Sequence, residues 1–487
     1  MIPLYDCQKD HVARLCDILE DQPAAFDFSP PGTGKTITSL WVANWYSQKH
    51  HFKQSRAVVV SLVPIIDSNW VPTTEYISFE SIASIGYEKL RGTYSTGCHN
   101  FFLNRHGDEY EVTAEFQQLI DEGILLIVDE YQKLKNAKTA QARSLFAIMR
   151  AIVGTKSRAL FLSATPYYNK RETESTIRLA GIVTATHLIE YLPKLGKYRQ
   201  EGINELRNYC NEIDRRLTAK LCPAIVTDKN YEDVIYDLFL KIIKPVLVSA
   251  MDAPPIKVNI TSINLLIDLP EHEDRQLIEA YEVLRKKIAV CKANNNLNGV
   301  YEAINTCSSI AERSKLGGTI EQLRKKAEED PNGKILLYVW LKESIEKAYE
   351  KLSEYFPGQV ATLNGDTPKG DRPKIISKYM EDNNNLRIII AHPSVGGVGI
   401  SLDDRTGRHR RYLFGMPTHR IIEEIQYIAR IYRITTTTDA EVTFILSKGV
   451  KSELQLIESA CEKLGILSEL TDPKYLQLIF PKQLVQG

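Results

Sequence analysis

The segment SPPGTGKT, residues 29–36, separates the apolar stretch AFDFS (25–29) from the helical pattern TITSLWVANWYS (36–47). A strand that leads through a glycine-rich loop into a helix is the arrangement that a phosphate-binding loop requires. Glycines allow backbone N–H groups to converge on phosphate oxygens, and the amino end of the helix adds positive potential. The alternative is a glycine turn that only caps a helix. The order of strand, loop and helix favours a phosphate-binding loop.

Individual residues of this segment indicate how it would hold a nucleotide. Lys35 would reach the β- and γ-phosphates, and Thr36 would offer its hydroxyl to Mg²⁺. Ser29 stands where such loops usually carry their first glycine. Three further residues would surround the phosphates with their backbone: Gly32, Thr33 and Gly34. The sequence therefore predicts an ATP·Mg²⁺ site on this loop.

An acidic pair supplies the second half of the predicted site. Asp129 and Glu130 follow the apolar run GILLIV (123–128), at the carboxyl end of a predicted strand. Asp129 is expected to hold Mg²⁺, and Glu130 is expected to orient the attacking water. Alone, such a pair is usually a solvated strand end. Downstream of a phosphate-binding loop, it becomes a catalytic candidate.

Apolar runs rich in β-branched residues alternate with helical patterns in two parts of the chain. Such strands predict parallel sheets covered on both faces, and hence an α/β fold with two lobes. Between the lobes we expect a mostly helical insertion with one strand pair at IKVNITSINLLIDL (256–269). The predicted strands lie at 25–29, 57–63, 123–130 and 159–165 in the first lobe, and at 334–339, 359–363, 386–392, 410–416 and 441–447 in the second.

Composition narrows the class of protein. The chain has 487 residues, of which 43% are hydrophobic and 25% charged, which suits two or three globular domains. We see no secretory signal and no apolar run long enough to cross a bilayer. Eight cysteines without a CxxC pair indicate reduced thiols rather than a zinc module. We therefore expect a soluble intracellular protein of the nucleus, cytoplasm or a virion, with no membrane partner.

Net charge is zero, so a nucleic-acid partner has to be argued from local features. Those features come from six blocks in a fixed order: LYDCQ, PPGTGKT, DEYQ, LSATP, GGVGISL and QYIARIYR. Each block is weak alone, but the ordered set resembles the motifs of superfamily-two helicases. The resemblance implies two RecA-like lobes at 1–190 and 326–487, with the insertion at 191–325. It also implies ATP hydrolysis coupled to movement on nucleic acid.

The same resemblance assigns roles within these blocks. Gln8 would read the adenine, for which an amide is chemically suited. Gly399 would contact the nucleotide from the second lobe. Four residues would couple hydrolysis to lobe movement: Gln132, Ser163, Thr165 and Gln426. Gln132 stands where histidine is commoner in this family. This substitution leaves open whether the block DEYQ makes its usual contact with the second lobe.

Arg430 and Arg433 match the arginines of the last block. Three residues apart, they are expected on one face of a helix. Their guanidinium groups suit phosphate, and one could act across the cleft as an arginine finger. The alternative is a surface helix with salt bridges.

A finer resemblance is to the Swi/Snf-like branch, including strawberry-notch-like helicases and ATPases of large DNA viruses. It rests on LKN (134–136), on VP…NW (63–70), on GGVGISL (396–402) and on the stretch from 401 to 426. The resemblance implies sequence-independent contacts to the nucleic-acid backbone. The residues expected to make them are Pro64, Asn69, Ser78, Asn364, Gly365, Gly396 and Gly397.

The loop RTGRHRR (405–411) carries four arginines in a chain without net charge. We expect Arg408 and Arg410 to contact backbone phosphates from a position near the mouth of the cleft. The alternative is a solvated turn whose arginines pair with Asp403 and Asp404.

Three classes of function remain. A motor that translocates on double-stranded DNA is the first expectation, because of the Swi/Snf-like blocks. A strand-separating DNA or RNA helicase and a transcription-associated DNA-dependent ATPase are the alternatives. A non-motor protein with a phosphate-binding loop would require the acidic and arginine pairs to be coincidental. DNA is expected over RNA as the partner.

Overall fold

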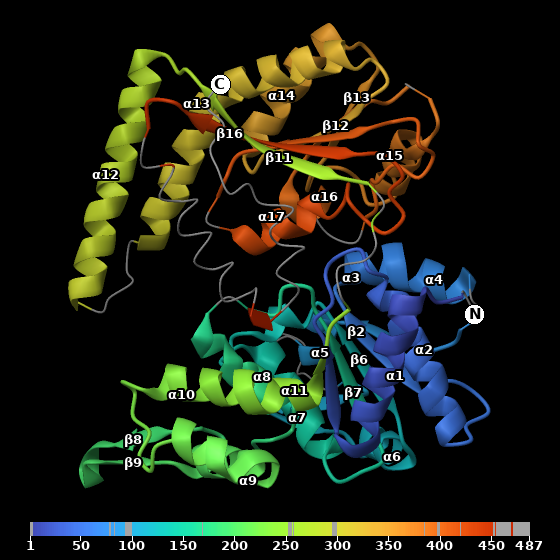
Figure 1. Cartoon of the computed structure of the whole chain (residues 1–487), viewed down its shortest axis with the longest axis vertical. Helices are drawn as coiled ribbons and strands as arrows, with labels where there is room; N and C mark the ends of the chain where they lie inside the picture. Colours follow the sequence, from blue (N-terminus) through green and yellow to red (C-terminus); the bar gives the residue numbers. More distant parts are fainter. Residues whose placement is uncertain are drawn as a thin grey trace. The chain divides into compact units, whose positions relative to one another are not determined.

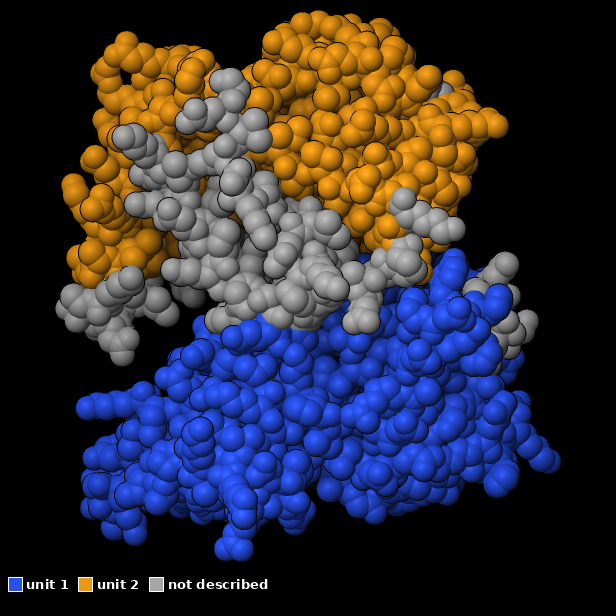
Figure 2. Space-filling model, in the orientation of Figure 1, with its two compact units in different colours: residues 1–254, 464–473 blue, residues 255–463, 474–487 orange. Residues whose placement is uncertain are grey.

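The chain forms two compact units in the computed structural model (Figure 2). Unit 1 comprises Met1–Pro254 and Leu464–Pro473, and unit 2 comprises Pro255–Lys463 and Lys474–Gly487. Each unit contains one six-stranded sheet. The structure describes residues 3–76, 79–81, 83–92, 100–167, 169–251, 256, 258–294, 300–383, 385–396, 400–418, 420–450, 453 and 469–470.

The sheet of unit 1 is parallel throughout, with the strand order β10-β1-β7-β6-β2-β3. Figure 1 labels three of its neighbouring strands, β7, β6 and β2. Its central strands are apolar and buried along their whole length, because helices cover both faces of a parallel sheet. The strands are β1 (Ala24–Asp27), β2 (Ala57–Ser61), β3 (Ala83–Gly86), β6 (Leu125–Asp129), β7 (Arg158–Leu162) and β10 (Val248–Ser249).

Helices and two hairpins complete unit 1. The hairpins are β4–β5 (Leu103–His106, Glu109–Val112) and β8–β9 (Glu190–Leu192, Lys197–Arg199). Helix α1 packs against α2 and β1. The helices are α1 (Asp6–Asp21), α2 (Lys35–Lys49), α3 (Val63–Ile65), the π-helical turn η1 (Ile66–Trp70), α4 (Val71–Tyr76), α5 (Tyr87–Arg91), α6 (Ala114–Glu122), α7 (Ala140–Ile152), α8 (Thr173–Leu179), α9 (Glu201–Leu221), α10 (Tyr231–Leu238) and α11 (Lys244–Leu247).

The sheet of unit 2 is also parallel, with the order β11-β16-β15-β12-β14-β13. Its strands are β11 (Ile260–Ile267), β12 (Lys334–Tyr338), β13 (Val360–Leu363), β14 (Ile388–Ala391), β15 (Arg411–Gly415) and β16 (Ala440–Ser447). A core of hydrophobic side chains joins this sheet to α13 and α14. The helices are α12 (Glu271–Asn294), α13 (Val300–Glu329), α14 (Lys342–Tyr355), α15 (Arg372–Met380), α16 (Pro393–Gly396) and α17 (Ile421–Ile428).

The predicted fold class is confirmed: the two parallel sheets form a tandem RecA-like α/β fold. The segment 191–325 is divided between the units at 254/255. The strand pair predicted at 256–269 is wrong, because this segment forms the single strand β11, which pairs in parallel with β16. None of the helices in the described parts of the chain is long and apolar enough to span a membrane.

A buried ion pair fixes the end of β16 to α13. Lys315 Nζ donates to Glu453 Oε1 at 2.6 Å and to the Ile445 carbonyl at 3.1 Å. Glu453 Oε2 accepts the Ser447 N–H at 2.6 Å. The side chains of the two charged residues are only 1% and 2% exposed. Since two backbone groups of β16 share this pair, it holds the end of this strand as well as two side chains.

Replacing Lys315 alone should therefore destabilise unit 2. Lys315→Met leaves a buried carboxylate without its partner, and such a change costs about 3–5 kcal/mol. We expect a loss of this size in the free energy of unfolding, measured by urea denaturation. Lys315→Met combined with Glu453→Gln should recover part of the loss, because no buried charge stays unpaired. An equal loss in the double variant would contradict this account.

Candidate active site

The glycine-rich loop connects the carboxyl end of β1 to the first turn of α2, as predicted. Gly32 and Gly34 have φ angles of 75° and 87°, a region that favours glycine. A Cβ atom on Gly34 would lie 2.7 Å from Gln8 Nε2. Lys35 Nζ donates to the carbonyl oxygens of Ser29 and Pro30, both at 2.9 Å. The ammonium group therefore lies over the loop on which phosphates are expected.

Gln8 belongs to the same site. It is buried in the first turn of α1, where its Nε2 donates to the Thr33 carbonyl at 2.8 Å. Its Oε1 accepts the Tyr5 N–H at 3.0 Å. The amide thus fixes the start of α1 to the phosphate loop. Its predicted reading of adenine stays a prediction.

A buried polar network behind the loop explains why Ser29 replaces the usual glycine. Ser29 Oγ accepts the Met251 N–H at 2.9 Å, and the Ser29 N–H donates to Asp27 Oδ1 at 2.9 Å. His11 lies 3.0 Å from Asp27 Oδ2 and 2.8 Å from Ser249 Oγ. Burial raises the pKa of Asp27, but the charge and hydrogen bond of His11, together with Lys35 and the Ser29 hydrogen bond, lower it overall. The hydroxyl of Ser29 therefore ties the loop to the edge strand β10.

Two consecutive residues of η1 hold the two predicted Mg²⁺ ligands. Asn69 Nδ2 donates to Thr36 Oγ1 at 2.7 Å. Trp70 Nε1 donates to Asp129 Oδ2 at 2.8 Å, and Ser61 Oγ donates to the same oxygen at 3.2 Å. A hydroxyl and a carboxylate are oxygen donors of the kind that Mg²⁺ prefers. The donor set therefore fits the ion. The nucleic-acid role predicted for Asn69 stays a prediction, beside this contact to Thr36.

The acidic pair lies in an unusual electrostatic and backbone environment. Burial, and then the charge of Glu130, raise the pKa of Asp129, while the Trp70 hydrogen bond opposes the shift. Glu130 has a φ of 57°, which is uncommon for a residue other than glycine. Tyr87 OH donates to the Asp129 carbonyl at 2.6 Å. Strained backbone of this kind concentrates at functional sites.

The predicted coupling residues of unit 1 form a continuous chain of hydrogen bonds. Gln132 Nε2 donates to Glu130 Oε2, and Gln132 Oε1 accepts the Ser163 hydroxyl at 2.6 Å. Ser163 Oγ in turn accepts the Thr165 N–H at 3.0 Å. These residues follow β6 and β7, which are neighbours in the sheet. Gln132 therefore links the predicted catalytic carboxylate to the loop after β7.

Three of the residues predicted in unit 2 lie at the carboxyl edge of its sheet. Asn364 and Gly365 follow β13, and Gly396 ends α16 after β14. Gln426 lies on α17, and in unit 1 Pro64 lies on α3. Three further predicted residues, Ser78, Gly397 and Gly399, lie outside the described residues.

Arg430 and Arg433 converge, but not for the predicted reason. The expectation that they share a helical face is wrong, because α17 ends at Ile428 and both arginines lie in the turn that follows. Instead, both guanidinium groups donate to the Ile400 carbonyl, at 3.1 and 2.8 Å. One backbone oxygen of the GGVGISL block thus brings the two arginines together.

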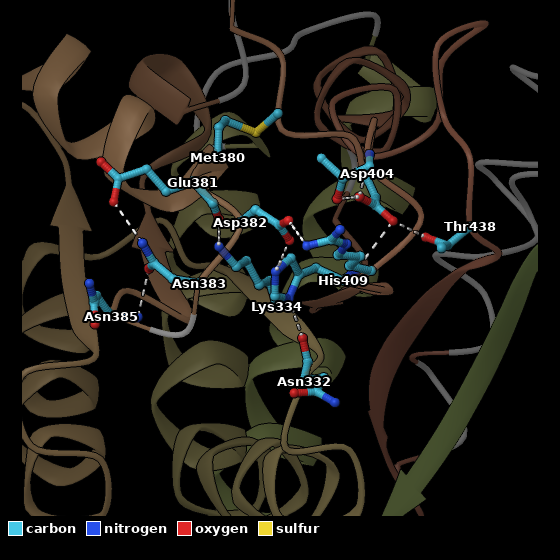
Figure 3. A network of polar contacts seen from close by, with 12 residues as sticks. Asn332, Lys334, Met380, Glu381, Asp382, Asn383, Asn385, Asp404, His409 and Thr438 are labelled. Carbon is cyan, nitrogen blue, oxygen red and sulfur yellow. Dashed lines mark hydrogen bonds and ion pairs between the residues drawn. The ribbon is translucent and has the colours of Figure 1, made fainter.

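The arginine-rich loop forms ion pairs within unit 2. Arg408 pairs with Asp382, and Arg410 lies 3.6 Å from Glu441. His409 also contacts Asp382, at 3.1 Å (Figure 3). These ion pairs agree with the alternative of a solvated turn. The carboxylates that pair with Arg408 and Arg410 are those of Asp382 and Glu441, whereas Asp403 and Asp404 were the predicted partners.

Within unit 2 the loop lies at the edge of the sheet opposite to the motif residues, and its predicted place near the mouth of the cleft stays a prediction. The loop precedes β15, and every strand of the sheet runs in the same direction. It therefore lies at the amino edge, with Asn332 and Asp382, which precede β12 and β14 (Figure 3). Asn364 and Gly396 lie at the opposite, carboxyl edge. The loop is not near the motif-bearing edge of unit 2.

Several residues of the site gave no recognisable signal in the sequence. Asp27 and Ser249 lie side by side because β1 pairs with β10, and His11 reaches both from α1. Tyr87 reaches Asp129 from α5. A single residue that acts through a contact distant in sequence leaves no periodic or spaced pattern. Only Trp70, beside the motif residue Asn69, could have been suspected.

Replacing Arg408 and Arg410 by alanine tests the ion-paired turn. A lost phosphate contact lowers the log–log salt slope of binding to duplex DNA by ~0.9. Because both arginines have carboxylate partners at the amino edge, we expect the slope of the double variant to equal that of the wild type. The slope is measured by titrating DNA from low to moderate salt. A slope lower by ~0.9 for one lost contact, or by ~1.8 for two, would establish the phosphate contact instead.

The chain is similar to known proteins in sequence and, more weakly, in structure. Residues 318–435 match the family of the helicase conserved C-terminal domain. A protein of Acanthamoeba polyphaga mimivirus that is named an ATP-dependent RNA helicase is 19% identical over 497 residues, which cover 96% of this chain and 84% of that protein. The SWI2/SNF2 ATPase core of Sulfolobus solfataricus in complex with dsDNA is similar at a TM-score of 0.34 and 14% identity, over 96% of this chain and 97% of that one. The family match and the viral relative support a nucleic-acid-dependent ATPase that carries a helicase C-terminal domain.

Proposed function

We propose that the protein is an ATP-driven motor of the Swi/Snf-like type that moves along DNA. The observation that carries the ATPase mechanism is the tie made by Asn69 and Trp70. These neighbours donate to Thr36 and Asp129, which come from the phosphate loop and from the acidic pair. The phosphate loop and the acidic pair, which separate motifs predict, are therefore both held by the turn η1. The DNA preference rests on the Swi/Snf-like blocks of the sequence.

ATP would bind on the loop after β1. Gly32, Thr33 and Gly34 would offer backbone N–H groups, and Lys35 would exchange the carbonyls of Ser29 and Pro30 for phosphate oxygens. Thr36 and Asp129 would hold Mg²⁺, which neutralises phosphate charge when bound. Glu130 would orient the water and accept its proton.

Coupling to movement would begin at Glu130. Its hydrogen bond to Gln132 continues to Ser163, so a change at the catalytic carboxylate alters the contacts of the loop after β7. The role of histidine in related proteins would here fall to the Gln132 amide, which can donate and accept at once. Arg430 and Arg433 would leave the Ile400 carbonyl to stabilise charge on the phosphate during turnover.

Variants of these residues should separate binding from chemistry. Lys35→Ala should weaken ATP binding and abolish turnover, because the ammonium contacts phosphate before hydrolysis. Glu130→Gln should still bind ATP but lose turnover by about 10²–10⁴-fold, since only the proton acceptor is removed. Arg430→Ala and Arg433→Ala should each lower kcat ~10³-fold or more. The measurements are binding of a fluorescent ATP analogue and steady-state hydrolysis.

Arg324→Ala is the matched control, because Arg324 forms ion pairs with Glu321 and Glu328 on α13, apart from the predicted site. It should hydrolyse ATP at the wild-type rate. Near wild-type turnover in Glu130→Gln would sink the assignment of the general base.

The nucleic-acid partner is tested by a panel of effectors. We expect DNA to stimulate ATP hydrolysis more than RNA of the same sequence and length. RNA is part of the panel because the mimivirus relative is named an RNA helicase. Stronger stimulation by RNA would replace the DNA motor by an RNA helicase. Duplex and single-stranded DNA are compared in the same panel, because strand separation is the second candidate function. The partly exposed Trp340 of unit 2 favours this second function.

A further inference from the structure

Three side chains gather at the middle of the carboxyl edge of the unit 2 sheet. Trp340 follows β12, His392 follows β14 and Arg420 follows β15. These strands are adjacent, in the order β15-β12-β14. We call these three residues the Trp340 platform. Asn364, predicted to contact nucleic acid, follows β13, the next strand along this edge.

The platform lies where the direction of sheet winding reverses. After β12 the chain adds β13 and β14 on one side of that strand, and it then crosses to β15 on the other side. In open parallel sheets, ligands bind outside the carboxyl ends of the strands at such a reversal. Trp340 and Arg420 follow the two strands that flank it. The topology alone therefore marks this position as a binding site.

The chemistry of the platform suits a planar ligand. The Arg420 guanidinium carbon lies 4.5 Å from the centroid of the Trp340 ring, and the His392 ring lies 5.5 Å away at 79° to it. Trp340 and Arg420 are both partly exposed. Among the described residues, no carboxylate forms an ion pair with Arg420. Indole rings and guanidinium planes are groups on which proteins stack nucleobases.

The charge of the platform comes from Arg420. Burial, and then the charge of Arg420, lower the pKa of His392. His392 Nδ1 also accepts the Ser394 N–H at 3.1 Å, so this nitrogen carries no proton. A neutral imidazole leaves one cation beside the indole. One cation is enough to attract the phosphate adjoining a stacked base.

A buried carboxylate holds the platform in place. Glu312 of α13 accepts the N–H groups of Trp340 and Leu341, each at 2.8 Å. Its side chain is buried, which raises its pKa and makes these backbone donors necessary. The backbone that carries Trp340 is thus fixed before any ligand arrives. Preorganisation of this kind reduces the entropy lost on binding.

We propose that the Trp340 platform stacks an unpaired nucleobase of the nucleic-acid strand on which the protein acts. This inference rests on the proposed motor function and deepens it, because it names the form of the substrate. A base inside an intact duplex has both faces covered by its neighbours, so only an unpaired base can reach the platform. The substrate therefore contains single-stranded nucleic acid at the point of contact.

The test measures binding of oligo(dT) to the full chain and the quenching of tryptophan fluorescence. Stacking of one base on an aromatic side chain corresponds to about 5- to 150-fold in affinity. Trp340→Ala should weaken oligo(dT) binding by at least the lower figure, and Trp340→Phe should retain part of the affinity. Oligo(dT) should quench wild-type fluorescence, and this quenching should be lost in Trp340→Phe.

Trp45→Ala is the matched control. Trp45 lies on α2, is partly exposed and has Lys49 at 5.1 Å from its ring centroid, so it repeats the cation–indole pair away from the platform. We expect it to bind oligo(dT) as the wild type does. Equal loss of affinity in Trp45→Ala and Trp340→Ala would overturn the proposal.

Other outcomes distinguish the sources of a stacked base. Quenching of Trp340 by ATP alone would show that the platform takes the adenine of the nucleotide, and equal quenching by a blunt duplex would show that no unpaired base is needed. Either result, or unchanged affinity in Trp340→Ala, overturns the inference and leaves the motor standing. Absence of nucleic-acid binding by the wild type would instead overturn the proposed function.

Discussion

The parallel direction of the strands is the constraint on which both units depend. The chain must cross over the sheet between two parallel strands, and the crossover helices cover both faces of the sheet. Only the edge formed by the carboxyl ends of the strands and the edge formed by their amino ends remain open. All carboxyl ends then lie at one edge, whatever their distance in sequence. In unit 1 this edge brings the phosphate loop after β1 near Asp129 after β6, with the loop after β7 between them. In unit 2 it brings Trp340, His392 and Asn364 together, and it places the arginine-rich loop at the opposite edge.

Within unit 1, the ends of the strands are fixed by a second layer of contacts. Asp129 is buried, and burial of a carboxylate is costly unless donors surround it. The Trp70 indole and the Ser61 hydroxyl supply such donors, while Asn69 orients Thr36. The same short π-helical turn therefore holds both of the predicted Mg²⁺ ligands. A π-helical turn is often found at functional sites, and here one side chain contacts the start of α2 while the next contacts the end of β6.

The sequence was informative where a signal is local. The strands at 57–61 and 388–391 are continuous apolar runs, because both of their faces are buried. The two residues of β10 and the partly exposed β3 lack that pattern, since an edge strand needs no apolar run. Motif order predicted the phosphate loop and the acidic pair. It could not predict that Arg430 and Arg433 meet at the Ile400 carbonyl, because the end of α17 depends on tertiary contacts. The position of the loop 405–411 required the direction of β15, which charge alone does not give.

Two departures from the usual motifs have local compensation. Ser29, in place of glycine, uses its hydroxyl to accept the Met251 N–H, a bond that glycine could not form. Gln132, in place of histidine, has one donor and one acceptor group engaged at the same time, with Glu130 and Ser163. In both cases the substituted side chain makes buried contacts of its own. Hydrogen bonds in a buried environment are costly to lose, because the partner group is left unsatisfied. A return to the common residue at either position would therefore break contacts that this chain has built around its own sequence.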